Sequence, residues 1–156
     1  MEVDLTTVEY LGQIERLETM IQNKEMEIHR LENMARGLSS PSLGDKIQTS
    51  SSKDKLGDTV AMMEDEIARL TDLIAYYLEL RARIIQQIDD MESNVYYQVL
   101  SLRFVQKKSY DEISTAINRT KRQAIRQTED AITEFEKIYS KYYKHSKSYI
   151  IRKKVS

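Results

Sequence analysis

The sequence predicts an all-α fold, in which a long antiparallel helical-hairpin coiled coil is followed by a C-terminal helix-turn-helix. Three observations support this class. Gly occurs 4 times and Pro once in 156 residues, so long stretches can stay helical. Two series of apolar residues repeat with heptad spacing. A short capped helix, a turn and a longer helix follow them. The expected domains are the hairpin (1–92), the helix-turn-helix (93–143) and a basic tail (144–156).

The first helix is expected to bury one seam of apolar residues. Their spacing alternates between three and four positions, as in a coiled coil. The seam consists of Ile14, Leu17, Ile21, Ile28, Leu31, Ala35 and Leu38, with Lys24 as its charged interruption. Gly37 and the segment Ser39-Ser40-Pro41 are typical of a helix end.

A second seam of the same spacing predicts the partner helix. It consists of Met63, Ile67, Leu70, Ile74, Tyr77, Ile84, Ile88, Met91 and Val95, with Arg81 as its charged interruption. Leu78 and Ile85 widen the stripe, which favours packing against another hairpin or the C-terminal domain. The seams could instead serve intermolecular bundles. Lys24 and Arg81 either set register or oligomeric state or extend their charged ends to the surface, and the second interpretation is favoured.

Residues 39–57 are predicted to be a flexible loop. The segment is rich in Ser and Lys and nearly free of large apolar residues. Loops of this length are usually disordered or functional, so an inert linker and a partner-binding loop are equally expected.

The C-terminal part contains the most informative pattern. Residues 95–106 predict an apolar helix that ends at Lys107-Lys108 and offers Val95, Val99, Leu100, Leu102 and Phe104 for burial. Ser109 and Glu112 then fit a capping box. The short helix that they begin is expected to bury Ile113, Ala116 and Ile117.

A turn and a longer helix complete this pattern. Asn118 and Arg119 form the expected turn, because Asn tolerates the left-handed conformation. Thr120 is a suitable N-cap for a helix from Lys121 to at least Phe135. That helix is expected to bury Ala124, Thr128, Ala131, Ile132 and Phe135.

Cations at the start of the second helix favour double-stranded DNA as a partner. In a helix-turn-helix these residues face base edges in the major groove. The predicted base-reading residues are Lys121, Arg122, Gln123, Ile125 and Arg126. The predicted contacts to the DNA backbone are Lys107, Lys108, Arg119 and Thr120. Charge supports this assignment: residues 1–102 contain 10 Lys and Arg against 19 Asp and Glu, whereas residues 103–156 contain 14 against 6.

The segment 109–135, SYDEISTAINRTKRQAIRQTEDAITEF, resembles region 4 of sigma-70-type factors. The pattern is carried by Ser109, Glu112, Ile113, Ile117, Thr120, Ala124, Arg126, Ala131, Ile132 and Phe135. Before its tail, the chain is similar to small phage proteins in the style of the ArpU and RinA regulators of phage late genes. The resemblance implies base-reading roles for Lys121, Arg122, Ile125 and Arg126. Gln127, in place of an apolar residue, and Asn118, in place of Gly, depart from the family pattern.

The segment from residue 138 onward combines cations with tyrosines. Its cations are Lys141, Lys144, Lys147, Arg152, Lys153 and Lys154, and His145 joins them when protonated. Tyr139 and Tyr142 are expected to be buried on a continuation of the long helix. The lysines are expected to contact the DNA backbone.

Enzyme chemistry is not expected. The chain has no Cys and only two His, His29 and His145, so no cluster has metal-ligand spacing. No Gly-rich phosphate loop is present, and the acidic runs fit solvated helix faces. We therefore expect no cofactor, metal or small-molecule substrate. No apolar run approaches the roughly 20 residues of a membrane span, and the N-terminus is too acidic and polar for a signal peptide.

These patterns together predict a sequence-specific transcriptional regulator, encoded by a phage or prophage and located in the cytoplasm of a bacterial host cell. A homodimer or homotetramer is expected, with RNA polymerase as a further partner to consider. Two alternatives remain open. A DNA-packaging protein of the small-terminase kind would form ring-sized oligomers. A coiled-coil adaptor would bind protein and show no salt-dependent DNA binding.

Overall fold

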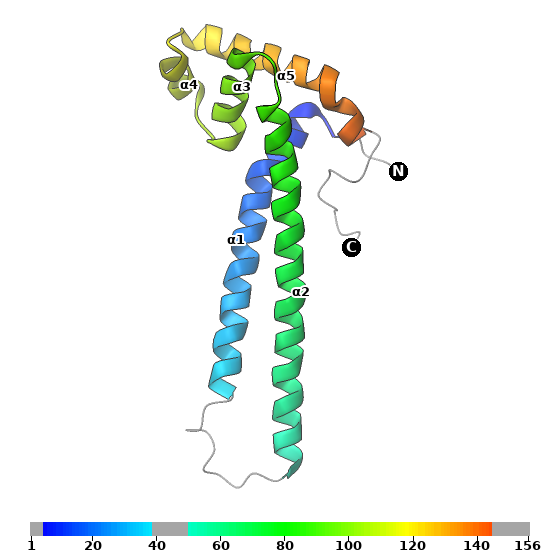
Figure 1. Cartoon of the computed structure of the whole chain (residues 1–156). Coiled ribbons are helices and arrows are strands. Elements are labelled where there is room, and N and C mark those ends of the chain that lie inside the picture. Colours follow the sequence, from blue (N-terminus) through cyan, green and yellow to red (C-terminus); the bar gives the residue numbers. More distant parts are fainter. Residues whose placement is uncertain (1–4, 39–49, 145–156) are drawn as a thin grey trace. The chain divides into compact units, whose positions relative to one another are not determined.

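The computed structural model describes residues 5–38 and 50–144, with backbone only for 50–53, and the elements in this part of the chain are all helices (Figure 1). No strand occurs among them, so the predicted all-α class is confirmed for this part of the chain. The elements are α1 (Thr7–Leu38), α2 (Ser50–Asp89), α3 (Asn94–Leu100), the π-helical η2 (Ser101–Val105), α4 (Tyr110–Ile117) and α5 (Lys121–Lys144).

The start of α2 corrects the predicted loop. Residues 50–57 are the first turns of α2, so the loop prediction is wrong for them, and residues 39–49 lie outside the described residues. The single Gly57 costs only about 1 kcal/mol in a helix, which a helix of 40 residues can carry. The hydroxyl of Thr59 donates to the carbonyl of Lys55 at 2.8 Å.

The chain divides into two compact units. The first unit contains residues up to Thr19 and from Leu78 onward, and the second contains Met20–Tyr77. The expected boundary after residue 92 therefore differs from the division in the structure. The first turns of α1 and the last turns of α2 belong with α3, α4 and α5, because their apolar faces share one core.

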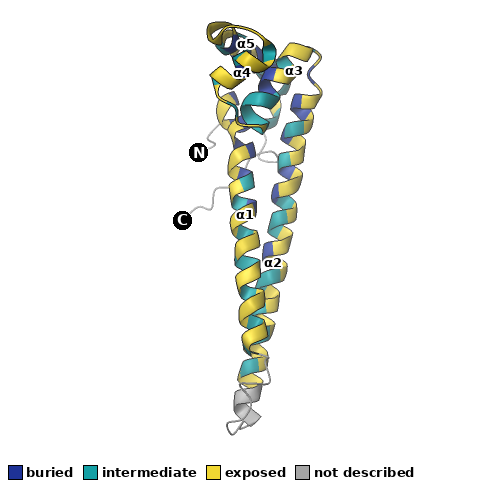
Figure 2. Cartoon of the chain, turned by 90° about the vertical axis from the view of Figure 1, so that its left-hand side faces the viewer, coloured by how far each residue is buried: buried dark blue, intermediate teal, exposed yellow. Residues whose placement is uncertain are grey.

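The second unit contains the remaining parts of α1 and α2, which lie side by side (Figures 1 and 2). Ile21, Leu70 and Tyr77 are buried, whereas the other expected seam positions of this unit are half-buried. Large side chains off the seam are exposed, among them Met26 and Met62. The seam residues are thus better covered than the flanking ones but incompletely covered within one chain.

The first unit has the larger core, drawn from both ends of the chain (Figure 2). Its buried apolar residues are Tyr10, Leu11, Ile14, Leu17, Leu80, Ile84, Ile88, Met91, Val99, Leu100, Ile113, Ala124, Ala131, Phe135 and Tyr143. Full burial of a large apolar side chain stabilises a fold by about 1.5–3 kcal/mol. Val95 is exposed, and Leu102 and Phe104 are only half-buried, which corrects the expectation for these three residues.

Aromatic residues join the first turn of α1 to the last turn of α5. Tyr10 and Tyr143 stack with ring centroids 4.4 Å apart. The hydroxyls of Thr7 and Tyr143 lie 2.6 Å apart, and the Tyr10 hydroxyl donates to Oε1 of Gln87 at 2.7 Å. Tyr143 therefore takes the buried position that was expected for Tyr139 and Tyr142, which are half-buried.

Candidate nucleic-acid interface

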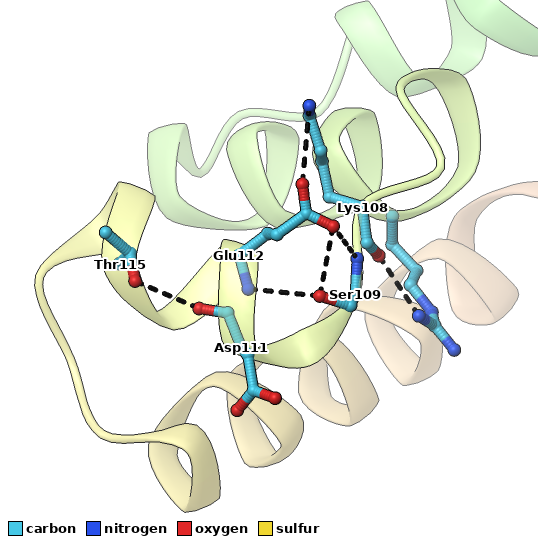
Figure 3. A network of polar contacts seen from close by, with 6 residues as sticks. Lys108, Ser109, Asp111, Glu112 and Thr115 are labelled. Atoms are coloured by element: carbon cyan, nitrogen blue, oxygen red, sulfur yellow. Dashed lines mark hydrogen bonds and ion pairs between the residues drawn. The ribbon is translucent and has the colours of Figure 1, made fainter.

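The N-terminus of α4 is held by the predicted capping box (Figure 3). The Ser109 hydroxyl accepts from the Glu112 amide at 3.2 Å, and Oε1 of Glu112 accepts from the Ser109 amide at 3.2 Å. The Ser109 amide and hydroxyl both donate to this carboxylate, which favours its charged form and holds the pKa of Glu112 below its usual range. The reciprocal bonds satisfy two backbone donors that a helix start leaves without intrahelical partners.

The turn between α4 and α5 also has the predicted geometry. Asn118 is in the left-handed conformation, with φ 55° and ψ 51°. The amide of Arg119 donates to the Ser114 carbonyl at 2.9 Å and so closes the end of α4. Asn adopts this conformation at lower cost than most residues, which explains its use where the resemblance would place Gly.

The first turn of α5 has a reciprocal cap of its own. The Thr120 hydroxyl accepts from the Gln123 amide at 3.2 Å, and Oε1 of Gln123 accepts from the Thr120 amide at 3.1 Å. Bidentate reading of adenine needs both the oxygen and the nitrogen of a Gln side chain. Since the oxygen of Gln123 is used in the cap, this residue is a weaker base-reading candidate than the sequence indicated.

One face of α5 packs into the core. Ala124, Thr128, Ala131 and Phe135 are buried as predicted, and Ile132 is half-buried. The Thr128 hydroxyl donates to the Ala124 carbonyl at 2.8 Å, so burying it leaves no unpaired donor.

The apolar face of α4 is narrower than predicted. Ile113 is buried, Ile117 is half-buried and Ala116 is exposed, which corrects the expectation for Ala116. With only eight residues, α4 presents little more than one buried side chain to the core.

The opposite face of α5 exposes cations. Lys121, Arg122 and Arg126 are exposed, and Ile125 is half-buried. Nζ of Lys121 lies 3.5 Å from Oδ1 of Asp111. The sequence indicated no carboxylate near Lys121, because Asp111 approaches it only through the fold. In the described part of the chain, Arg122 and Arg126 form no ion pair.

The predicted backbone-contact residues have different surroundings. Lys107 forms an ion pair with Glu18 of α1, and Nζ of Lys108 lies 3.5 Å from Oε2 of Glu112. Arg119 and Thr120 are exposed at the turn that precedes α5, and Arg119 has no ion-pair partner among the described residues. Arg119 thus remains a strong candidate for phosphate contact, while Lys107 is engaged within the protein.

Two further residues near this site were not anticipated from the sequence. The guanidinium of Arg103 donates to the Lys108 carbonyl at 3.1 Å and lies 4.2 Å from the ring centroid of Tyr110. Glu18 pairs with Arg81 at 2.9 Å as well as with Lys107. No local sequence signal predicts the pairs of Glu18, because its partners come from separate segments.

Burial and ion pairing shift the pKa of Glu18 in opposite directions. Partial burial alone would raise its pKa, but the hydrogen bonds and charges of Lys107 and Arg81 outweigh that effect and lower the pKa. Arg81 therefore has a partner across the helix pair, in contrast to the solvent-directed side chain that was favoured from the sequence.

Other expected features have little bearing on this site. Within residues 5–38 and 50–144, no group of His, Cys, Asp and Glu side chains is arranged to hold a metal ion. None of the helices there has the length and apolar character needed to cross a membrane. His145 and the cations Lys147, Arg152, Lys153 and Lys154 lie outside the described residues.

The arrangement can offer guanidinium groups to an anionic ligand from the first two turns of a well-anchored helix. Comparison of the chain with models of protein families, with curated proteins and with solved structures finds no match.

Proposed function

We propose that this protein is a sequence-specific DNA-binding transcriptional regulator, with α4, the Asn118 turn and α5 acting as a helix-turn-helix. The observation that carries the proposal is the pair Arg122 and Arg126. They are exposed, form no ion pair among the described residues, and lie one turn apart on a helix whose opposite face is buried. Such a pair is positioned by the core and leaves its donors available.

Electrostatics supports an anionic partner. The positive end of the helix dipole makes cations unfavourable in the first turn of α5, yet Lys121 and Arg122 occupy it and no acidic residue does. Asp111 offsets this only in part, because both members of its pair with Lys121 are largely exposed. DNA phosphates would neutralise these charges, and Arg can donate two hydrogen bonds to O6 and N7 of guanine.

We assign assembly to α1 and α2, as an antiparallel hairpin coiled coil that forms a homodimer or homotetramer. The incompletely covered seam of the second unit and the exposed Met26, Met34 and Met62 support this assignment. A symmetric dimer would require half-sites about one helical turn of DNA apart. The origin in a phage or prophage and any contact with RNA polymerase rest on the resemblance to late-gene regulators and to sigma-70 region 4.

The test is selection of DNA sites by the full chain, followed by affinity measurements on the recovered site at several salt concentrations. The double variant Arg122→Ala/Arg126→Ala should lose about 1–3 kcal/mol per arginine contact, or roughly 5- to 150-fold in affinity for each. The matched control is Arg30→Ala/Arg69→Ala, which removes the same charge from exposed pairs of the second unit.

The outcomes separate the candidate functions. Equal affinity of the two double variants would refute the assignment of the recognition helix. A ring-sized assembly would favour DNA packaging. No site enrichment and no salt-dependent binding would favour a protein-binding adaptor.

A further inference from the structure

The turn between η2 and α4 is held in an unusual backbone conformation. Lys107 has φ 57°, in the left-handed region that residues with a side chain seldom adopt. The next amide, that of Lys108, donates to the Leu102 carbonyl at 2.9 Å, and the Lys108 carbonyl accepts from Arg103 at 3.1 Å. Such a conformation persists where its surroundings fix it, and here it directly precedes the capping box of α4.

Glu18 fixes the same turn from α1. Its Oε1 accepts from Nε of Arg81 at 3.0 Å and from Nη2 of Arg81 at 2.9 Å, while its Oε2 pairs with Lys107. One carboxylate thus connects α1, α2 and the turn that leads into α4. All three side chains are partly covered, with exposures of 25% for Glu18, 32% for Arg81 and 42% for Lys107.

The position of this triad in the chain is informative. Glu18 precedes the last α1 residue of the first unit, Thr19, and Arg81 comes three residues after Leu78, where α2 enters the same unit. A relative shift of α1 and α2 at this point would move the two oxygens of Glu18 away from one of their cations. The turn before α4 would then lose a support.

We propose that Glu18 is a positioning residue, which makes the orientation of α4, and through it α5, depend on the register of α1 against α2. The inference rests on the proposed DNA-binding function. It assigns Lys107 an internal role in place of the phosphate contact expected from the sequence. Half-exposed ion pairs contribute little net stability, whereas charged pairs are well suited to specify register.

The test uses the full chain and the variants Glu18→Gln, Lys107→Gln and their combination. Glu79→Gln is the matched control, because it removes a carboxylate from an exposed pair with Arg83 within α2. The measurements are hydrogen exchange at the amides of Lys108 and Ser109, the affinity for the selected DNA site and its salt dependence, and the thermal midpoint.

Both single variants should speed exchange at Lys108 by about 1.5- to five-fold, the range expected for loss of a partly exposed ion pair from a local opening equilibrium. DNA affinity should fall by a similar factor, while the slope of log affinity against log salt stays unchanged. The double variant should resemble Glu18→Gln, since that change already removes the pair with Lys107. Glu79→Gln should change neither exchange nor affinity.

Two results would overturn the proposal. Unchanged exchange in Glu18→Gln, with or without a lower thermal midpoint, would leave Glu18 with at most a stabilising role. A salt slope reduced by about 0.9 in Lys107→Gln would identify Lys107 as a phosphate contact. If the wild-type chain binds no DNA, the proposed function fails, and hydrogen exchange alone still decides whether Glu18 holds the turn.

Discussion

The hydroxyl pair of Thr7 and Tyr143 permits a direct test of how α1 is attached to α5. Tyr143→Phe removes one hydroxyl from a contact of 2.6 Å between two buried side chains and keeps the ring that stacks on Tyr10. Thr7 also hydrogen-bonds to Glu136, which limits the loss. A net loss of about 1 kcal/mol is expected for one hydrogen bond, or roughly 2–4 °C in the thermal midpoint of a chain of this length.

Thr7→Val completes a double-mutant cycle. It should cost more than Tyr143→Phe, about 1–3 kcal/mol, because a buried phenol is left without its hydrogen-bond partner. The combined variant should be less destabilised than Thr7→Val alone, because Tyr143→Phe removes the phenol that Thr7→Val leaves unpaired. Burial raises the pKa of Tyr143, so its hydroxyl stays protonated and the coupling should be the same at neutral and mildly alkaline pH.

The assay is thermal and urea unfolding followed by circular dichroism, with the helical signal of each folded variant compared first. Additive losses in the combined variant would show that the two hydroxyls do not interact and would refute this account of the contact. A Tyr143→Phe variant as stable as the wild type would have the same meaning.

Three further changes test local features. Ser109→Ala should destabilise the chain by about 1 kcal/mol through loss of the α4 cap, measured by urea unfolding; a neutral result would contradict the capping box. The pKa of Glu112 is lowered from its usual value of 4.5, so the charged carboxylate stabilises the fold above that pH, and this stabilisation is lost as pH falls through the lowered pKa. Glu112→Gln should therefore flatten the fall of the thermal midpoint in acid. A thermal midpoint with the same pH profile as the wild type would contradict this role of Glu112. Asn118→Ala should lower the free energy of unfolding by about 1–2 kcal/mol, whereas Asn118→Gly should change it little, since only Gly accepts φ 55° freely. Equal unfolding free energies of the two variants would contradict the left-handed turn.

Features that depend on neighbouring residues in the sequence were predictable. Ser109 and Glu112 are three positions apart, and Asn118 terminates a short helix, so their geometry follows from local rules. The spacing of Ala124, Thr128, Ala131 and Phe135 likewise identifies a buried helix face without knowledge of what covers it. The local composition of residues 50–57 was misleading, because Ser, Lys and Gly are typical of loops but do not prevent a long helix from extending through them.

Features that depend on distant segments were not predictable. Lys107 and Lys121 look like free cations in the sequence, yet Glu18 and Asp111 lie beside them in the fold. Gln123 looks like a base-reading residue, but its side-chain oxygen is taken by the cap of its own helix. The candidate interface is therefore narrower than the pattern indicated, with Arg122 and Arg126 at its centre.

The contact between Thr7 and Tyr143 also has a consequence for how the protein is made. The two residues are 136 positions apart, so the core cannot close until the last turn of α5 has been synthesised. At about 5–20 residues per second, this leaves roughly 7 to 27 seconds during which the apolar face at the start of α1 lacks its final cover on the ribosome. Many proteins of only helices fold through local contacts, whereas the first turn of α1 cannot complete its packing in this chain until Tyr143 has been made.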